Sequence, residues 1–303
     1  MPKLVFSCLF NEDFTWHRLL VDNFLAHTPD NCHLIINSGS ILAEVESDRI
    51  HMFVGSKRNS KLGHYLLRGH LESLDWAMNF LDDIEFFISM ASNSLFFRSL
   101  DIKELRDSYI NSLPRNLCID LNALPSEWLW LNLKDSSAFP LILENLEQKG
   151  ILSVANEQIE GLAATVNDWL LIRNVFGGLL PLLLSSEINV PFEEIIPVSA
   201  IHSLGSKRHT HICKVFWPSR HPDKPQGLVS ISDLIEVQIL PKHICMYKWF
   251  ARDQLVLETR LVTTWAGQST LKFLQELIPV LCDSSNVSRD DVNQIYNMSF
   301  GRR

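Results

Sequence analysis

Short apolar runs alternate with longer segments of helical periodicity between residues 3 and 90, and this alternation constrains the fold more than any other feature of the sequence. The apolar runs lie at 3–10, 33–37, 50–54 and 85–90. Between them, apolar residues repeat at helical spacing over 16–29 and 63–81. Strands that alternate with helices in this way build a mostly parallel sheet flanked by helices, so we expect an α/β fold.

The carboxyl ends of the expected strands form the candidate ligand-binding rim, because open α/β sheets bind their ligands there. This rim comprises residues 7–11, 37–40 and 89–94. The rest of the chain is less periodic, and no linker or repeat divides it, so we expect a single domain over 1–303. Further helices are expected at 101–111, 169–184, 232–240 and 269–281.

Charge and composition exclude several classes of protein. The formal net charge of −8 makes a broad nucleic-acid or anionic-lipid surface unexpected. The most apolar segment, 169–184, contains Arg173, Asn174 and Pro181, and it falls short of the roughly 18 uninterrupted apolar residues of a membrane span. The six cysteines are dispersed and include no Cys-x-x-Cys pair, so we expect them to be buried free thiols. We expect a soluble, cytoplasmic protein with no membrane span.

Common catalytic and phosphate-binding motifs are missing from the sequence. It contains no Gly-x-Gly-x-x-Gly, no phosphate-binding P-loop and no Gly-x-Ser-x-Gly elbow. His209 and His211 can face one side of a strand and hold a metal, but the sequence shows no third ligand. A basic cluster is either a solvated loop or a contact for a pyrophosphate or polyanionic acceptor; its members are Lys207, Arg208, Lys214, Arg220 and Lys224.

Several segments, taken in order, resemble one family, the inverting glycosyltransferases that include the core-2 β-1,6-N-acetylglucosaminyltransferases and the peptide O-xylosyltransferases. The resemblance covers roughly residues 4–260 and implies a GT-A-like, Rossmann-type fold. It further implies a nucleotide-sugar-binding half at 1–120, an acceptor and catalytic half at 121–290, and a tail at 291–303. The segments that carry it are 4–11, 16–20, 31–37, 63–71, 86–99, 167–176, 191–200, 232–234 and 249–253.

The resemblance also implies an activity, the transfer of a GlcNAc-like or xylose-like sugar from a UDP-sugar to a hydroxyl of a glycan, lipid-linked glycan or glycoconjugate, as in polysaccharide biosynthesis. Glu194 matches the catalytic base, and Glu193 is the alternative if the register shifts by one. Two exposed acids that cap the following helix are the structural alternative. The sequence contains no Asp-x-Asp triplet, so we expect Arg252 and Lys248, rather than a metal cofactor, to stabilise the leaving diphosphate.

Other residues are placed by their position in the matching segments. The donor-binding candidates are Ser7, Asn11, Asn37 and Arg68, of which the first three lie near expected strand ends and suit the uracil or ribose. The candidates for the substrate cleft are Ser92, Asn93, Trp169 and Arg173. For Trp169, a place in the hydrophobic core is the alternative, as for most apolar helices with one tryptophan.

Two other functions stay open at this point. Asn93, Leu95 and Phe97 depart from the family's Asp-x-Pro-Leu-Lys turn, which favours a catalytically silent glycan-binding or scaffold protein with the same fold. A metal-dependent transferase of another family, using His209 and His211, is the third possibility.

Overall fold

The computed structural model describes residues 1–12, 14–40, 42, 45–56, 64–112, 139–152, 154–155, 157–185, 191–215 and 240–248, with the backbone alone at 14, 15 and 139. Several expectations lie outside the described residues. They concern the helix at 232–240 apart from its last residue, the helix at 269–281, the tail at 291–303, Cys118, Arg220, Lys224, Arg252 and Cys282.

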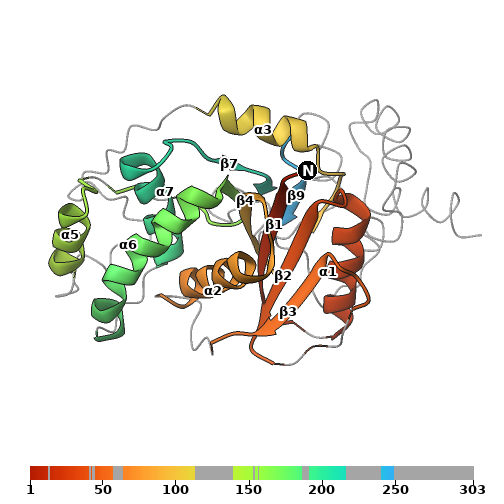
Figure 1. Ribbon diagram of the computed structural model, residues 1–303, viewed down its shortest axis with the longest axis horizontal. Coiled ribbons are helices and arrows are strands. Elements are labelled where there is room, and N and C mark those ends of the chain that lie inside the picture. The colour runs from red at the N-terminus through yellow and green to blue at the C-terminus, as the bar shows by residue number, and fades with distance from the viewer. Residues whose placement is uncertain are drawn as a thin grey trace, which may run out of the picture.

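A six-stranded sheet forms the centre of the fold, with the strand order β3-β2-β1-β4-β6-β7 (Figure 1). The first four of these strands run parallel, β6 runs antiparallel to β4, and β7 runs antiparallel to β6. The expected α/β class with a mostly parallel sheet is therefore confirmed. The strands are β1 (Lys3–Phe10), β2 (Cys32–Ser38), β3 (Ile50–Val54), β4 (Ile84–Ala91), β6 (Leu162–Thr165) and β7 (Thr210–His211).

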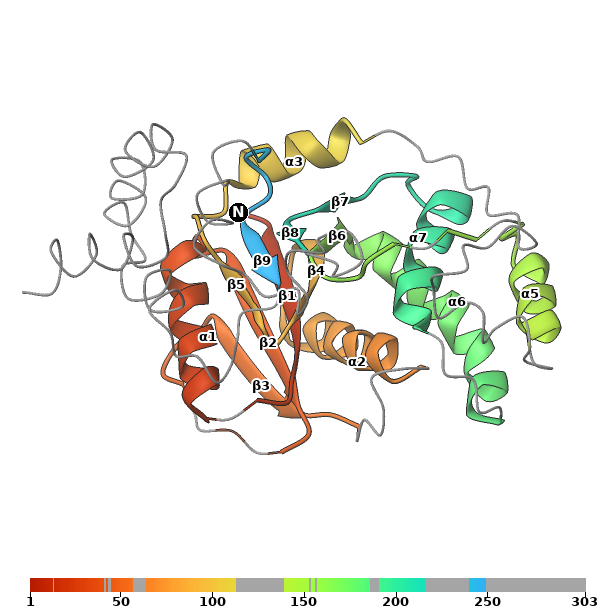
Figure 2. The same ribbon diagram turned by 180° about the vertical axis from the view of Figure 1, so that it is seen from behind.

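Different helices cover the two faces of this sheet (Figures 1 and 2). Side chains alternate along a strand, so Val5 and Phe6 of β1 point to opposite faces. Phe6 packs against Phe24, with ring centroids 5.3 Å apart, and Val5 belongs to the buried cluster on the other face. The first face carries α1 (Phe14–His27); the second carries α2 (Tyr65–Phe80), α6 (Val166–Ser185) and α7 (Phe192–Leu204).

Two shorter helices, α3 and α5, are the remaining described helices. In α3 (Ile102–Ile110), the Asp101 carboxylate accepts hydrogen bonds from the backbone N–H groups of Lys103 and Glu104. An acidic N-cap of this kind fixes the start of a helix, and the helix expected at 101–111 is confirmed. The helix α5 (Phe139–Gln148) packs beside α6 at the far end of the molecule (Figure 1).

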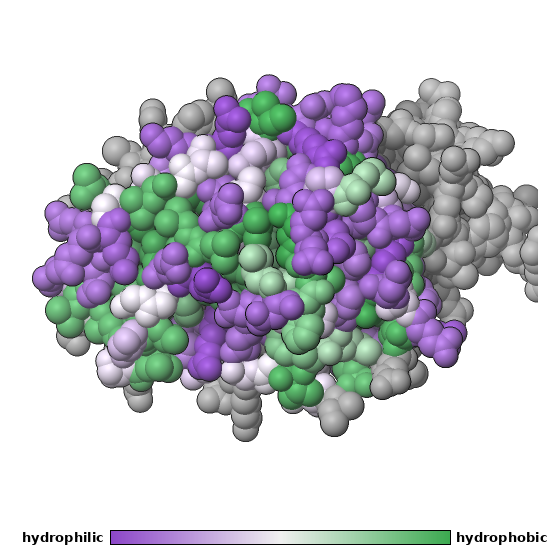
Figure 3. All heavy atoms as spheres, viewed as in Figure 1, coloured by the Kyte–Doolittle hydropathy of each residue, from purple (hydrophilic) through white to green (hydrophobic). Residues whose placement is uncertain are grey.

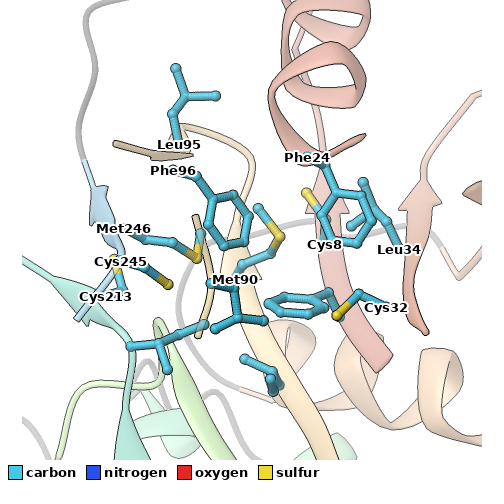
Figure 4. Packing of buried hydrophobic residues seen from close by; sticks show 14 of the residues in the cluster. Cys8, Phe24, Cys32, Leu34, Met90, Leu95, Phe96, Cys213, Cys245 and Met246 are labelled. Atoms are coloured by element: carbon cyan, nitrogen blue, oxygen red, sulfur yellow. The ribbon is translucent and has the colours of Figure 1, made fainter. Parts of the chain in front are cut away.

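A second, three-stranded sheet lies beside the first, with the order β5-β9-β8. It contains β5 (Ser94–Phe96), β8 (Cys213–Lys214) and β9 (Met246–Lys248). The polar segment expected to turn at 91–94 therefore ends in a strand. Figure 4 shows the sulfur-rich packing between the sheets. The four described cysteines are buried thiols, as expected: Cys8, Cys32, Cys213 and Cys245. Burial raises the pKa of Cys32 to about 12.

Among the described residues, α6 is the one helix that by length and composition is able to cross a membrane. In this fold its Ile172, Phe176 and Leu179 are buried against the sheet. Leu141 of α5 and Leu184 of α6 are about half exposed, and Figure 3 shows apolar surface at this end of the molecule. The absence of a membrane span stays a prediction.

Candidate functional site

The carboxyl ends of β1 and β4 meet through a group of polar side chains, as the sequence predicts. The Ser92 hydroxyl, just after β4, lies 3.1 Å from Asn11 Oδ1 and 2.5 Å from Glu12 Oε1. The Trp16 indole N–H donates to the Ser92 carbonyl at 2.5 Å. Asn93 is buried next to Ser92, whereas Asn11 is exposed. This rim holds the β4–β5 turn against the end of β1 and leaves Asn11 open to a ligand.

The end of β2 is occupied by hydrogen bonds within the protein. The Asn37 amide donates to the Gly69 carbonyl at 2.9 Å, and Arg68 Nε lies 3.1 Å from Glu72 Oε1. Burial alone would raise the pKa of Glu72, but hydrogen bonds from Ser56 and the Arg68 charge outweigh burial, and the pKa is lowered. Asn37 and Arg68 therefore have partners inside the protein.

Ser7 does not lie at a strand end. It is fully buried in the middle of β1, opposite Ser89 of β4, and its hydroxyl lies 2.9 Å from His70 Nδ1 of α2. The expectation that Ser7 contacts a nucleotide is therefore corrected: the hydroxyl satisfies a buried histidine, as buried polar groups generally require.

Trp169 and Arg173 do not line a cleft either. Trp169 is completely buried and packs edge-on against Phe87, with ring centroids 5.0 Å apart. Arg173 forms an exposed ion pair with Asp75, joining α6 to α2 at 2.5 Å. The tryptophan is a core residue because α6 places it against the sheet, which was the alternative that the sequence left open.

A group of charged side chains lies where the loop before β6 contacts the last part of β4. The Gly161 N–H donates to the Ser89 carbonyl, and Gly161 has φ +78°, with Cys213 so close that an added Cβ would lie 2.4 Å from its Cβ. A glycine is therefore required here. The adjacent Glu160 carboxylate forms an ion pair with Lys248 of β9.

Glu193 and Glu194 lie in the first turn of α7, close to this ion pair. The backbone from Phe192 to His202 is buried, and only 4% of Glu193 and 8% of Glu194 is exposed. The alternative of two exposed capping acids is therefore wrong. Among the described residues, Glu160, Glu193 and Glu194 each have one carboxylate oxygen, Oε2, that is buried without a hydrogen-bond partner.

Burial and mutual repulsion shift both α7 carboxyls toward their neutral forms. The pKa of Glu194 is raised to about 8, first by burial and then by the Glu160 charge, while the Lys248 charge opposes the rise. The pKa of Glu193 is raised well above its ordinary value, first by burial and then by Glu194 and Glu160. Glu194 can therefore exchange a proton near neutral pH, and it is less deeply buried than Glu193. This difference favours Glu194 as a general base.

A third potential metal ligand, which the sequence does not reveal, lies beside His209 and His211, the first just before β7 and the second in it. Glu157 Oε2 is 2.8 Å from His209 Nε2, and Glu157 Oε1 is 3.7 Å from His211 Nε2. The His209 Nδ1 atom in turn lies 2.9 Å from His202 Nε2. Glu157 is far from the histidines in sequence, so spacing alone gave no signal for it. The Glu157 N–H donates to the Glu194 carbonyl at 2.8 Å, which joins this group to the α7 carboxyls.

No protein-family model matches this chain, and no curated protein matches it. Among solved structures, the chain is similar to that of the galactosyltransferase LgtC in complex with donor and acceptor sugar analogues. The two share 10% sequence identity over 95% of this chain and 98% of that chain, with a TM-score of 0.39. A likeness this distant assigns no function, so the function has to be argued from the residues of the chain itself.

Proposed function

We propose that this protein is an inverting glycosyltransferase that uses a UDP-sugar as donor and a glycan or glycoconjugate hydroxyl as acceptor. The observation that carries the proposal is Glu194, a buried carboxyl with one unpartnered oxygen and a pKa raised to about 8, at the carboxyl edge of a mostly parallel sheet. Ligands of such sheets bind at this edge. The resemblance over 191–200 places the catalytic base at the same residue.

In the proposed reaction, the oxygen of the acceptor hydroxyl attacks the anomeric carbon of the donor sugar. At the same time the Glu194 carboxylate removes the proton of that hydroxyl. The bond between that carbon and the diphosphate oxygen breaks, and its electron pair leaves with UDP. The proton then passes from Glu194 to solvent. A base with a pKa near the working pH is well suited to this step, because it ionises readily and still binds a proton strongly.

The departing diphosphate needs positive charge, since negative charge develops on the leaving oxygen. In our proposal, Arg252 supplies most of it, because Lys248 already forms an ion pair with Glu160. Asn11, open at the rim beside Ser92 and Asn93, is placed to contact the nucleoside. The donor sugar is GlcNAc-like or xylose-like, and the reaction proceeds in the cytoplasm without a metal on the diphosphate.

The packing of Leu95 and Phe97 weakens the alternative that this protein is a catalytically silent glycan-binding or scaffold protein. Leu95 is fully buried in β5, and Phe97 packs on Tyr247 with ring centroids 4.5 Å apart. These two departures from the family pattern therefore fill the core around the second sheet. Their presence is explained by packing and does not argue for a lost activity.

Calorimetry with UDP in excess chelator tests the donor proposal, and a panel of UDP-sugars monitored for slow hydrolysis tests the activity. Binding in the presence of chelator is expected. Replacing Arg252 by Ala should weaken UDP more than uridine, by about 1.5 to 3 kcal/mol for a lost charged hydrogen bond. Binding that requires added manganese or magnesium contradicts metal independence, and equal weakening of UDP and uridine removes Arg252 from the phosphate site.

A further inference from the structure

We propose that Glu157, His209 and His211 bind one divalent transition-metal ion, with Zn²⁺ as the best match to two imidazoles and one carboxylate. None of its three residues is among those proposed to hold the diphosphate, and the inference does not depend on the proposed function. Its three ligand atoms lie within 4.8 Å of one another. Nitrogen and carboxylate ligands in this combination are typical of zinc and of other late first-row metals.

Strand geometry brings the three side chains together. His209 and His211 are two residues apart on an extended segment, so they project to the same side. His211 pairs with Leu162 of β6, and the Ile212 N–H donates to the Gly161 carbonyl at 2.9 Å. These backbone contacts hold the loop that carries Glu157 against β7.

The distances fit an ion with a small adjustment of the side chains. Ligand atoms about 2.05 Å from a tetrahedral ion lie about 3.3 Å from one another. The two distances from Glu157, 2.8 Å to His209 Nε2 and 3.7 Å to His211 Nε2, lie on either side of that value.

The surroundings of His209 are those of an oriented ligand. Its Nδ1 lies 2.9 Å from His202 Nε2, so an Nδ1–H donated to His202 leaves the Nε2 lone pair directed at Glu157 and the ion. Metal-binding histidines usually have their second ring nitrogen fixed in this way. The loop before His209 is anchored as well, because the Ser206 N–H and hydroxyl donate to the Asp168 carboxylate at 2.9 and 2.7 Å.

Burial and charge both favour a cation. The side chains of His209, Glu157 and His211 are 7, 14 and 17% exposed, which shelters the group from water while leaving an entry path. Charge favours a cation through Glu157 itself, whose carboxylate contacts both imidazoles. Because the Glu157 N–H donates to the Glu194 carbonyl, an ion held here also fixes the first turn of α7.

Titration of the chelator-treated protein with Co²⁺, followed by visible absorption, tests the site, and repetition with Zn²⁺ followed by thermal unfolding gives a second measurement. We expect one ion per chain and a higher melting temperature in its presence. His211→Gln and Glu157→Gln should each weaken binding by 100-fold or more and abolish the rise in melting temperature. His202→Gln should weaken binding by about 10- to 100-fold, as expected for a residue that orients a ligand.

His51→Gln is the matched control, because His51 also lies next to another histidine, with 3.0 Å between His51 Nε2 and His33 Nδ1, at the opposite edge of the sheet. Its metal affinity should equal that of the unchanged protein. No stoichiometric binding by the unchanged protein, or binding that survives both His211→Gln and Glu157→Gln, overturns the proposal. UDP calorimetry with and without the ion keeps this result separate from that of the proposed transferase.

Discussion

Two regions of the molecule differ in whether their polar side chains have hydrogen-bond partners within the protein. In the middle of β1, at the end of β2 and in the first turn of α2, Ser7, Asn37 and Arg68 are bound to neighbouring residues. Around the start of α7, Glu193 and Glu194 are buried with one carboxylate oxygen each that lacks a partner among the described residues. The first arrangement stabilises the fold, because its hydrogen bonds are satisfied internally.

The second arrangement costs stability unless something binds there, since an unsatisfied buried carboxyl is unfavourable. Proteins retain such groups mainly at functional sites, where a shifted pKa is needed. A polar residue near a strand end is therefore a poor guide to a site by itself. The more informative feature is a buried polar group that the rest of the protein leaves unpaired.

The largest expected effect follows from replacing the proposed base. Glu194→Gln should lower sugar transfer by about 10² to 10⁴, the usual contribution of general acid–base catalysis, while UDP affinity stays unchanged. Glutamine keeps the shape of the side chain and removes the ionisable group. Steady-state transfer rates and UDP calorimetry on the same preparation measure both quantities.

Glu193→Gln is the matched control for this experiment, because it makes the same chemical change one residue earlier on the same helix. Its effect on transfer should be far smaller, since Glu193 is more deeply buried than Glu194 and burial favours its neutral form. Near-normal transfer by Glu194→Gln defeats the assignment. A large loss in Glu193→Gln instead shows that the base is Glu193.

The next largest effect, on stability, is expected from replacing Lys248, which forms an ion pair with Glu160. Lys248→Met should destabilise the protein by about 3 kcal/mol, because it leaves Glu160 charged and nearly buried without its partner. Chemical denaturation measures this change. Lys103→Met is the control, since its ion pair with Asp107 is exposed, and stability should stay nearly unchanged. Equal stabilities of Lys248→Met and the unchanged protein would show that the ion pair contributes nothing.

The sequence predicted most elements of the first half and the helix α6, expected at 169–184, but it did not predict α5, α7 or the short strands β6 to β9. The failure at the short strands has a physical reason. The strands from β1 to β4 and the helices α1 and α2 are long and strongly periodic, and their observed bounds lie close to the predicted ones. β6 to β9 have two to four residues each, too few to show a period, and they are strands only because distant segments pair with them.

The same contrast holds for the candidate site. The resemblance named Glu193, Glu194 and Lys248, and the structure places all three near Glu160. Neither Glu157 nor Glu160 was predicted, because both lie in a loop without periodicity and meet their partners only through tertiary contacts. Ser7 and Trp169 were misplaced because a sequence does not show which way a side chain points.

A smaller effect should appear in the dependence of stability on pH. The folded-state pKa of Glu194 is raised to about 8, so the unfolded chain gives up this proton at lower pH than the folded protein. The stabilisation is fully present below the ordinary pKa and is lost as pH rises toward 8. Between about pH 6 and about pH 8 we expect a loss of about 2 kcal/mol in the free energy of unfolding. Denaturation of Glu194→Gln should show a flatter profile; an equally steep one assigns the dependence to other groups.

The smallest expected effect belongs to Arg68, which the resemblance placed at the donor. Arg68→Gln removes an ion pair with Glu72 in which both side chains are partly exposed, so it should cost less than about 1 kcal/mol of stability. UDP affinity should change little, because the guanidinium already donates to Glu72 and to the Ser56 hydroxyl at 3.1 and 3.0 Å. Calorimetry with UDP and with uridine measures this directly. If Arg68→Gln weakens UDP by tenfold or more and leaves uridine unaffected, Arg68 must release Glu72 to bind the diphosphate. The end of β2 would then belong to the binding site, and the contrast between the two regions would not hold.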